Sequence, residues 1–466
     1  MKIKEFLEEV RKGNIDVKEY TAKAIEQTKK IDKENNYMNL ISEELALSQA
    51  KSSSGKLKGL LITVKDNICV KDIESTAGSK ILKGYLPRFN ATVIQKLVDE
   101  GAIILGKTSM DEFGFGSFNT NVGVGFKIPS NPLDSSRVTG GSSGGSAGIT
   151  AKANFVHASI AESTGGSIES PASFCGVTGF CPTYGRISRY GLISYANSLD
   201  KIGPMTKTIE DSAFLLDFMC GYDSKDSTSL NESQDFNNFH SFVGKQIKGT
   251  KIGIIKEAFG EGVNEEVKKT VLDAVKKLES QGCKVEEISL PFVQKYSLAV
   301  YYLLATAEAS TNLACLSGLR YGAEGEMKGL HFDEYFTKIR TENFGEEAKR
   351  RIMLGTFARM SGYRDAYYLK ATKIRTKIIE EYKKSLKKFD CLISPTMPIV
   401  APKFEEIKKL SPIQNYMMDI LTVGPSLAGL PHASIPLKTK NLPVGMQIIS
   451  DHFQEGKVIQ LGSALE

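Results

Sequence analysis

Histidine is scarce in this sequence, which has 5 among its 466 residues. The five are too far apart for the spacing of a metal cluster, so we expect no metal site in the chain. Only His157 lies within the glycine- and serine-rich part of the sequence, where its apolar neighbours are typical of a packed side chain. If the chain has a catalytic base, we expect it to be another residue type.

Cysteine pairs of the CxxC kind are also absent from the sequence. The cysteines are odd in number and scattered, which argues against a disulfide framework and against a zinc site. Free thiols in a reducing compartment are the better interpretation. The seven are Cys69, Cys175, Cys181, Cys220, Cys283, Cys315 and Cys391.

Long apolar runs are missing too. No stretch approaches the ~18 apolar residues that a membrane-spanning helix needs. The opening residues, MKIKEFLEEVRKG, are charged and lack the apolar centre of a signal peptide. We therefore expect a cytoplasmic protein that does not associate with membranes.

Signatures of nucleotide and nucleic-acid binding are not found. The sequence has no zinc finger and no RNP motif, and its net charge of +6 is mild enough to arise from solvated lysine-rich helices. The glycine- and serine-rich segment lacks the GK[ST] ending of a phosphate-binding loop, and its next lysine is Lys152. We therefore expect no cofactor in this chain.

Strand-like and helix-like periodicities alternate along the chain, which predicts an α/β fold. Clean linkers are few, so we expect one domain over 1–466, with N-terminal helices in about 1–50 and a catalytic core in about 59–206. Helices are predicted over 3–13, from the cap Asp16 to about Asp32, over 91–99 after the cap Asn90, over 264–281 and over 359–388. Strands are predicted over 60–64, 102–105, 251–255, 284–290 and 390–394.

The segment 131–191 is dense in Gly, Ser, Thr and Pro, yet it is not expected to be a flexible linker. Large apolar residues such as Phe155, Phe174 and Phe180 interrupt it. Glycines in a packed segment allow the backbone to approach a ligand closely. We therefore interpret this segment as the centre of a binding or catalytic site.

Three pieces of sequence together indicate nucleophilic catalysis. Lys65 follows an apolar strand, and a lysine buried there can replace histidine as a base, although alone it is typical of a surface lysine. Paired serines, Ser142 and Ser143, stand among four glycines. Ser167 follows Gly165-Gly166, whose amides can face developing negative charge. Serine–lysine nucleophilic sites are an established variant of serine catalysis.

These motifs resemble the amidase signature family, in which a lysine after an apolar strand is followed by GGSSGG and then by GGS. The resemblance covers nearly the whole chain. Within the family the sequence resembles the A subunits of amidotransferases that act on glutamyl-tRNA(Gln) or aspartyl-tRNA(Asn). The matching stretches beyond the serines are 171–179, 182–192, 198–204, 307–310, 349–352, 362–368 and 427–431.

The resemblance implies a fold and a set of roles. The fold would be a central mixed β-sheet covered by helices on both faces. Ser167 would attack the side-chain amide of glutamine, Ser142, in a cis peptide, would relay protons to neutral Lys65, and Ser143 would support the relay. Substrate and oxyanion contacts are implied for further residues: the amides of Thr164, Gly165 and Gly166 for the oxyanion, Arg351 for the α-carboxylate, Asp419 for the α-ammonium, and Tyr302, with Tyr301 as a near alternative, for the pocket wall.

The resemblance also implies partners. Ammonia released from glutamine would pass to a B subunit in a complex with B and C subunits. ATP, magnesium and the misacylated tRNA would be handled by the partners, because no phosphate-binding loop is found here. Two alternatives remain open, namely a stand-alone amidase for small amides and a non-catalytic scaffold subunit.

Two positions depart from the family pattern. The family usually has Asp before the Thr of the second motif and Arg after its Ser-Ile, where this chain has Ser163 and Glu169. The serines are also 25 positions apart, one more than is usual. The departures suggest that an ion pair bracing the nucleophile loop is lost, with Glu162 as a substitute acid and Glu169 in need of a cation. We expect the site to survive and an arginine at position 169 to be tolerated.

Overall fold

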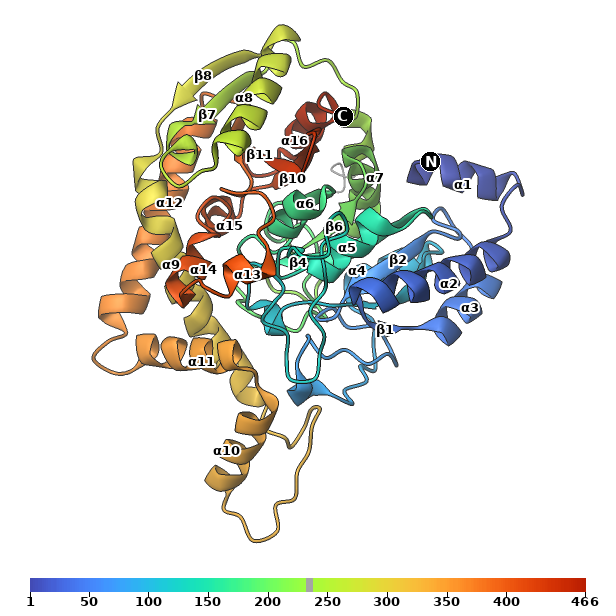
Figure 1. Ribbon diagram of the computed structural model, residues 1–466, viewed down its shortest axis with the longest axis vertical. Coiled ribbons are helices and arrows are strands. Elements are labelled where there is room, and N and C mark those ends of the chain that lie inside the picture. Colours follow the sequence, from blue (N-terminus) through green and yellow to red (C-terminus); the bar gives the residue numbers. More distant parts are fainter. Residues whose placement is uncertain (232–237) are drawn as a thin grey trace.

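A computed structural model describes residues 1–231 and 238–466. One mixed sheet runs through this part of the chain, with the strand order β1-β3-β2-β4-β6-β5-β10-β11-β9-β7-β8 (Figure 1). Strand β2 pairs in parallel with β3 and β4, and β7 pairs in parallel with β8 and β9, while the remaining neighbours are antiparallel. The α/β class and the single mixed sheet agree with the sequence-based prediction.

The strands are short, and β2, β3, β4, β5, β6, β9 and β11 are buried along their whole length. Such continuous burial is expected where helices cover both faces of a sheet. Their bounds are β1 Met38–Ile41, β2 Leu61–Lys65, β3 Ile103–Thr108, β4 His157–Ser163, β5 Thr178–Cys181, β6 Lys201–Thr206, β7 Lys251–Ile255, β8 Lys284–Ile288, β9 Cys391–Pro395, β10 His432–Leu437 and β11 Val444–Ile449.

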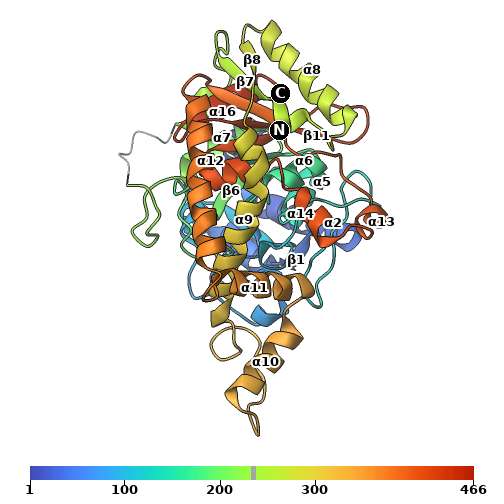
Figure 2. The same cartoon turned by 90° about the vertical axis from the view of Figure 1, so that its left-hand side faces the viewer.

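Helices form a layer on each side of the sheet, and α10 extends away from the body (Figures 1 and 2). The α-helices are α1 Ile3–Arg11, α2 Val17–Asn35, α3 Glu43–Ser52, α4 Thr92–Asp99, α5 Gly144–Lys152, α6 Glu169–Cys175, α7 Ile209–Met219, α8 Glu265–Ser280, α9 Pro291–Asn312, α10 Phe332–Asn343, α11 Glu346–Arg359, α12 Lys370–Leu386, α13 Phe404–Ile407, α14 Pro412–Met417, α15 Val423–Ala428 and α16 Glu455–Ser463. Short turns of other helix types are η1 Lys80–Leu82, η2 Glu112–Gly114, η4 Phe239–Phe242, η5 Lys256–Phe259, η6 Leu313–Cys315 and the π-helical η7 Asp365–Leu369.

Two hydrophobic clusters cover the two faces of the sheet. In β9, Cys391 and Ile393 belong to the first cluster and Leu392 to the second, as the alternation of side chains along a strand requires. Residues of α1 to α4, α7, α8 and α16 contribute to the first cluster, and residues of α9 to α12 and α15 to the second. The sheet is therefore held from both sides, and the loops at its strand ends are fixed in place.

Several predicted helix starts are confirmed, and two predictions are wrong. Asp16 caps α2 by accepting a hydrogen bond from the amide of Glu19, and Asn264 caps α8 in the same way. Asn90 does not cap α4, because its side-chain oxygen accepts from the amide of Lys71 instead. The predicted helix over 359–388 is interrupted, since α11 ends at Arg359 and Gly362 adopts a φ of 87° before the chain turns into η7 and α12.

Among the described residues, no helix is both long and apolar enough to cross a membrane.

Candidate active site

Lys65 is the last residue of β2, one position beyond the predicted strand, and its side chain is fully buried. Its Nζ lies 2.7 Å from Oγ of Ser142, 2.8 Å from the carbonyl oxygen of Glu162 and 2.9 Å from Oε2 of Glu162. Because β4 pairs in parallel with β2, Glu162 reaches the same edge of the sheet as Lys65. Two neighbouring strands therefore place the lysine against the serine.

Ser142 and Ser143 occupy the turn that leads into α5. The peptide bond between Gly141 and Ser142 is cis, which agrees with the resemblance. Ser143 precedes the first residue of α5, its hydroxyl donates to the carbonyl oxygen of Glu162 at 3.1 Å, and its amide donates to the carbonyl oxygen of Ser167 at 3.1 Å. The turn before α5 is thus tied to the loop that carries Ser167.

Ser167 is buried in the loop between β4 and α6. No described residue accepts a hydrogen bond from the amides of Gly165, Gly166 or Ser167, which leaves these donors available. A side chain at either glycine would collide with a neighbour, because a Cβ at position 165 would lie 2.7 Å from the hydroxyl of Tyr301 and one at 166 would lie 2.2 Å from that of Thr422. The glycines let this backbone lie close to the helices around it.

Glu162 forms a buried network that reaches beyond Lys65. Its Oε2 accepts a hydrogen bond from Nδ2 of Asn67 at 3.0 Å, and its Oε1 lies 2.7 Å from Oγ1 of Thr164. The same hydroxyl of Thr164 lies 2.8 Å from Oδ1 of Asp200. The carboxyl of Glu162 therefore contacts the nucleophile loop at Thr164, as the sequence suggested, and its second oxygen faces Lys65, which the sequence did not suggest.

The three residues predicted to bind the substrate's head group come together although 117 positions separate two of them. The hydroxyl of Tyr302 on α9 donates to Oδ2 of Asp419 at 2.6 Å. The guanidinium of Arg351 on α11 lies over the ring of Tyr302, with 5.2 Å between Cζ and the ring centre. Burial raises the pKa of Asp419, while the hydroxyl of Tyr302 and the charge of Arg351 oppose that rise.

Aromatic side chains that the sequence analysis missed surround Arg351. Its Nη1 donates to the hydroxyl of Tyr195 at 2.7 Å, and its Nε donates to Oε1 of Glu347 at 2.8 Å. The rings of Phe115, Tyr195 and Tyr416 also pack against the guanidinium. Such rings attract a cation and leave its remaining N–H groups for a ligand. Arg351 and Tyr416 line a pocket of about 290 Å³.

Tyr301 takes a different position from Tyr302. Its ring lies against the Gly165 backbone, and its hydroxyl lies where a Cβ at that glycine would be. The two tyrosine rings pack edge to face, with 5.0 Å between their centres. Tyr301 therefore contacts the nucleophile loop, whereas Tyr302 contacts the pair formed by Arg351 and Asp419.

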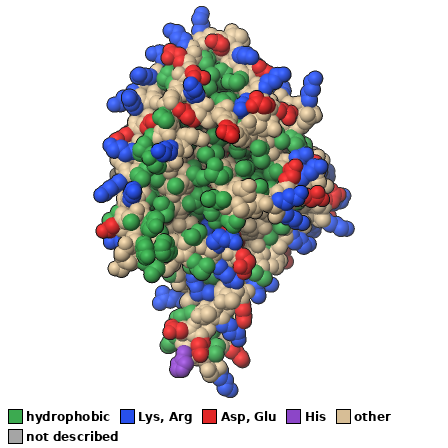
Figure 3. Space-filling model, turned by 60° about the vertical axis from the view of Figure 1, so that its left-hand side comes forward, with side chains coloured by type: hydrophobic (Ala, Val, Ile, Leu, Met, Phe, Trp, Pro, Cys, Tyr) green, Lys and Arg blue, Asp and Glu red, His purple; other side chains and the backbone are tan. Residues whose placement is uncertain are grey.

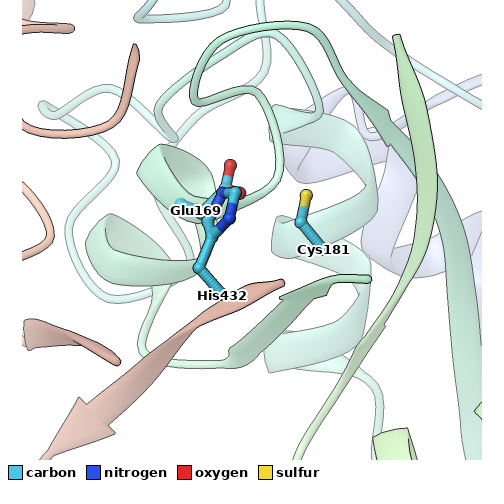
Figure 4. Close-up of side chains that lie close together, drawn as sticks. All are labelled: Glu169, Cys181 and His432. Atoms are coloured by element: carbon cyan, nitrogen blue, oxygen red, sulfur yellow. The ribbon is translucent and has the colours of Figure 1, made fainter. Parts of the chain in front are cut away.

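The two departures from the family pattern lie against each other below the nucleophile loop. The hydroxyl of Ser163 donates to Oε2 of Glu169 at 3.0 Å. Oε1 of Glu169 lies 2.5 Å from Nε2 of His432, and Cys181 lies beside them (Figure 4). Burial alone would raise the pKa of Glu169, but the positive charges of His432 and Lys201 outweigh it and hold the pKa at about 2. The missing cation is thus supplied by β10.

Glu169, Cys181 and His432 have the side chains of a metal site, but their spacing fits an ion pair better. Ligand atoms held at about 2 Å from a tetrahedral zinc lie more than about 3 Å apart. The contact of 2.5 Å between Glu169 and His432 is shorter than that. The structure argues against the expectation that arginine is tolerated at position 169, because a guanidinium there would face His432 and the buried Lys201.

Comparisons with known proteins agree with this geometry. A family model described as Amidase matches residues 19–459. The A subunit of the glutamyl-tRNA(Gln) amidotransferase from Thermoanaerobacter pseudethanolicus is 46% identical over 474 residues, which cover 100% of this chain and 95% of that protein. A protein of the same name from Halothermothrix orenii is 46% identical over 93% of this chain and 90% of its own length.

A solved structure is similar over almost the same range. The crystal structure of the glutamyl-tRNA(Gln) amidotransferase A subunit from Thermotoga maritima superposes with a TM-score of 0.80 and 38% sequence identity, covering 95% of this chain and 90% of that one. The family model spans the sheet, the paired serines and the pocket around Arg351 alike. The chain therefore belongs to the amidase family.

Proposed function

We propose that this chain is the glutamine-hydrolysing A subunit of a tRNA-dependent amidotransferase. The observation that carries the proposal is the combination of two sites in one buried region. Lys65 contacts Ser142 at the end of β2, and Arg351 and Asp419 flank Tyr302 across the nucleophile loop. The first arrangement suits cleavage of an amide, and the second suits the charged head group of an amino acid.

Catalysis begins with proton transfer through the two serines. Neutral Lys65 takes the proton of Ser142, and Ser142 takes the proton of Ser167. The Ser167 oxygen then attacks the side-chain amide carbon of glutamine. The amides of Thr164, Gly165 and Gly166 stabilise the negative charge that forms on the amide oxygen, as such donors do in acyl transfer. This assignment is consistent with the amides of Gly165 and Gly166, which donate no hydrogen bond to any described residue.

Ammonia leaves when the tetrahedral intermediate collapses. The proton held by Lys65 returns through Ser142 to the departing amine, so that a glutamyl ester of Ser167 and free ammonia remain. Water then cleaves the ester by the same relay and releases glutamate. Each cycle returns Lys65 to its neutral form.

Recognition of glutamine divides between two charged groups. Arg351 binds the α-carboxylate with N–H groups that its contacts to Tyr195 and Glu347 leave available. Asp419 binds the α-ammonium and is held by the hydroxyl of Tyr302. A generic amidase has no need of this pair, so the pair favours glutamine over a small uncharged amide.

The remaining steps belong to partners. We propose that B and C subunits bind this chain, that ATP and magnesium activate the misacylated tRNA on a partner, and that the complex is cytoplasmic. Hydrophobic side chains gather on the face shown in Figure 3. Exposed hydrophobic residues on α11 and the turn after it suit a lasting interface: they are Met353, Leu354, Phe357, Met360, Tyr363 and Tyr367.

The first test is glutamate release from glutamine by the purified chain, alone and with B and C subunits and misacylated tRNA. Release that rises sharply in the complex supports the amidotransferase assignment. Ser167→Ala should abolish amidation from glutamine and spare amidation from free ammonia. Cleavage of simple amides without any turnover of glutamine would support a stand-alone amidase instead.

A scaffold without activity is separated by a chemical probe. A fluorophosphonate reacts with activated serines, so labelling of the chain that disappears in Ser167→Ala identifies Ser167 as the nucleophile. Absence of labelling in the folded complex would support the scaffold.

A further inference from the structure

The three contacts of Lys65 suit the three hydrogens of an ammonium, and they also suit a neutral amine. A neutral amine has two hydrogens and one lone pair. Nζ has three oxygen neighbours, and two of them belong to Glu162. When both hydrogens point to Glu162, the lone pair points to the hydroxyl of Ser142, 2.7 Å away. Glu162 therefore aims the base at the proton that it removes.

The contacts of Oε1 of Glu162, the carboxyl oxygen that does not face Lys65, show that Glu162 and Asp200 share a proton. The hydroxyl of Thr164 lies 2.7 Å from Oε1 of Glu162 and 2.8 Å from Oδ1 of Asp200. A hydroxyl has one hydrogen and donates to only one of these oxygens. The other contact is a hydrogen bond only when that carboxyl itself carries a proton. One proton is therefore held between Glu162 and Asp200.

We propose that Glu162 is a positioning residue for Lys65 and that it exchanges a proton with Asp200 through the hydroxyl of Thr164. While Lys65 is neutral, Glu162 is protonated on Oε1 and Asp200 is the anion. When Lys65 gains the proton of Ser142, Oε1 passes its proton to Thr164 and Thr164 passes its own to Asp200. Glu162 becomes the anion beside the new ammonium, and the number of protons in the network is unchanged.

The surroundings of Asp200 suit this exchange. As an anion it accepts hydrogen bonds from the amides of Tyr195 and Ala196. Burial raises the pKa of Asp200 well above its usual value, and the negative charge of Glu162 raises it further, so Asp200 takes up the proton once Glu162 is the anion. The other charged groups near the network are Asp111, Arg189 and Lys201. Among the described residues, none of these three is hydrogen-bonded to Oε1 of Glu162 or to the Thr164 hydroxyl.

The test measures how fast a fluorophosphonate labels Ser167 between pH 5 and pH 9, and it rests on the proposed nucleophile. In Glu162→Gln no carboxylate stabilises the ammonium of Lys65. In a plot of labelling rate against pH, the acidic limb is the part where the rate falls as the pH is lowered. This limb should then move to lower pH by about one unit, and the highest labelling rate should fall at least ~10-fold. In Asp200→Asn the amide donates to Thr164, which fixes the anion on Glu162, and the limb should move to higher pH.

Displacement of the acidic limb in opposite directions in the two variants supports the proton exchange. If one variant does not fold, the direction of displacement in the other decides whether the exchange occurs. A lower rate without displacement, or displacement in the same direction in both, would overturn it. The matched control is Glu455→Gln, which removes a buried carboxylate paired with Arg186 away from the site and should leave the limb in place. If the wild-type chain is not labelled, the proposed function fails as well, whereas labelling with unmoved limbs refutes only the exchange.

Discussion

Oε1 of Glu169 lies 2.5 Å from Nε2 of His432, which joins the helix after the nucleophile loop to strand β10. Both side chains are fully buried. A buried pair that loses one partner leaves an uncompensated charge, which costs more than an exposed pair does. The contact therefore holds α6, and with it the loop of Ser167, against the centre of the sheet.

Glu169→Gln is expected to lower the free energy of unfolding by about 3–5 kcal/mol. His432→Gln should have a similar effect, and the double variant should lose less than the sum of the two. Denaturant unfolding of all four proteins measures the coupling, which should be at least about 1 kcal/mol. Strictly additive losses would show that the two side chains act separately. Glu169→Arg should be less stable than Glu169→Gln, because it brings a third cation to His432 and Lys201.

Arg351→Met should reduce kcat/KM for glutamine by about 100-fold or more, because it removes the proposed partner of the α-carboxylate. Hydrolysis of acetamide, which has no head group, should fall much less. Asp419→Asn should also reduce kcat/KM for glutamine more than hydrolysis of acetamide, with a smaller loss than Arg351→Met. Equal losses on both substrates would indicate that these residues only support the fold of the pocket.

Gly165→Ala should reduce the rate of glutamine hydrolysis by about 100-fold, because the added methyl group meets the ring of Tyr301 and displaces an amide that we propose to bind the oxyanion. Removal of that ring should relieve the collision. The double variant Gly165→Ala/Tyr301→Ala is therefore expected to be more active than Gly165→Ala alone. A double variant that is no more active than the single one would exclude the tyrosine as the cause.

His157 should make the folded chain sensitive to mild acid. Burial, followed by the charge of Lys207, lowers its pKa from 6.5 to about 3. Below pH 6.5 the unfolded chain binds a proton there and the folded chain does not, so stability falls as the pH falls. This histidine should account for a loss of about 2 kcal/mol between about pH 6.5 and pH 5. His157→Leu should lose correspondingly less over that range, measured by denaturant unfolding at both pH values.

The sequence was informative where a residue's role depends on its immediate neighbours. The apolar run before Lys65, the caps Asp16 and Asn264, and the glycines beside the serines all act through adjacent backbone. The helix over 359–388 was mispredicted because its polar and aromatic spacing continues through Gly362, where the backbone turns.

Residues whose role depends on distant partners were not recognised from the sequence. His432 has the apolar neighbours of any packed histidine, and only the pairing of β10 with β5 places it near Glu169. Tyr195 and Tyr416 reach Arg351 from segments that no local pattern connects with α11. Glu162 stands in the sequence next to Ser163, which departs from the family pattern. Its contact with Lys65 is visible only in the fold, because it follows from the parallel register of β2 and β4.

The charged groups that we propose for reaction and for recognition lie in separate stretches of this chain, although Phe115 and Tyr195 of the first stretch also contact Arg351. The groups that we propose to move protons lie between positions 65 and 200, in or near the strand ends. The groups that we propose to bind the head group lie between positions 302 and 419, on α9, on α11 and after α14. Substitutions in the second stretch can therefore alter which amide is accepted while the bond-breaking apparatus stays intact.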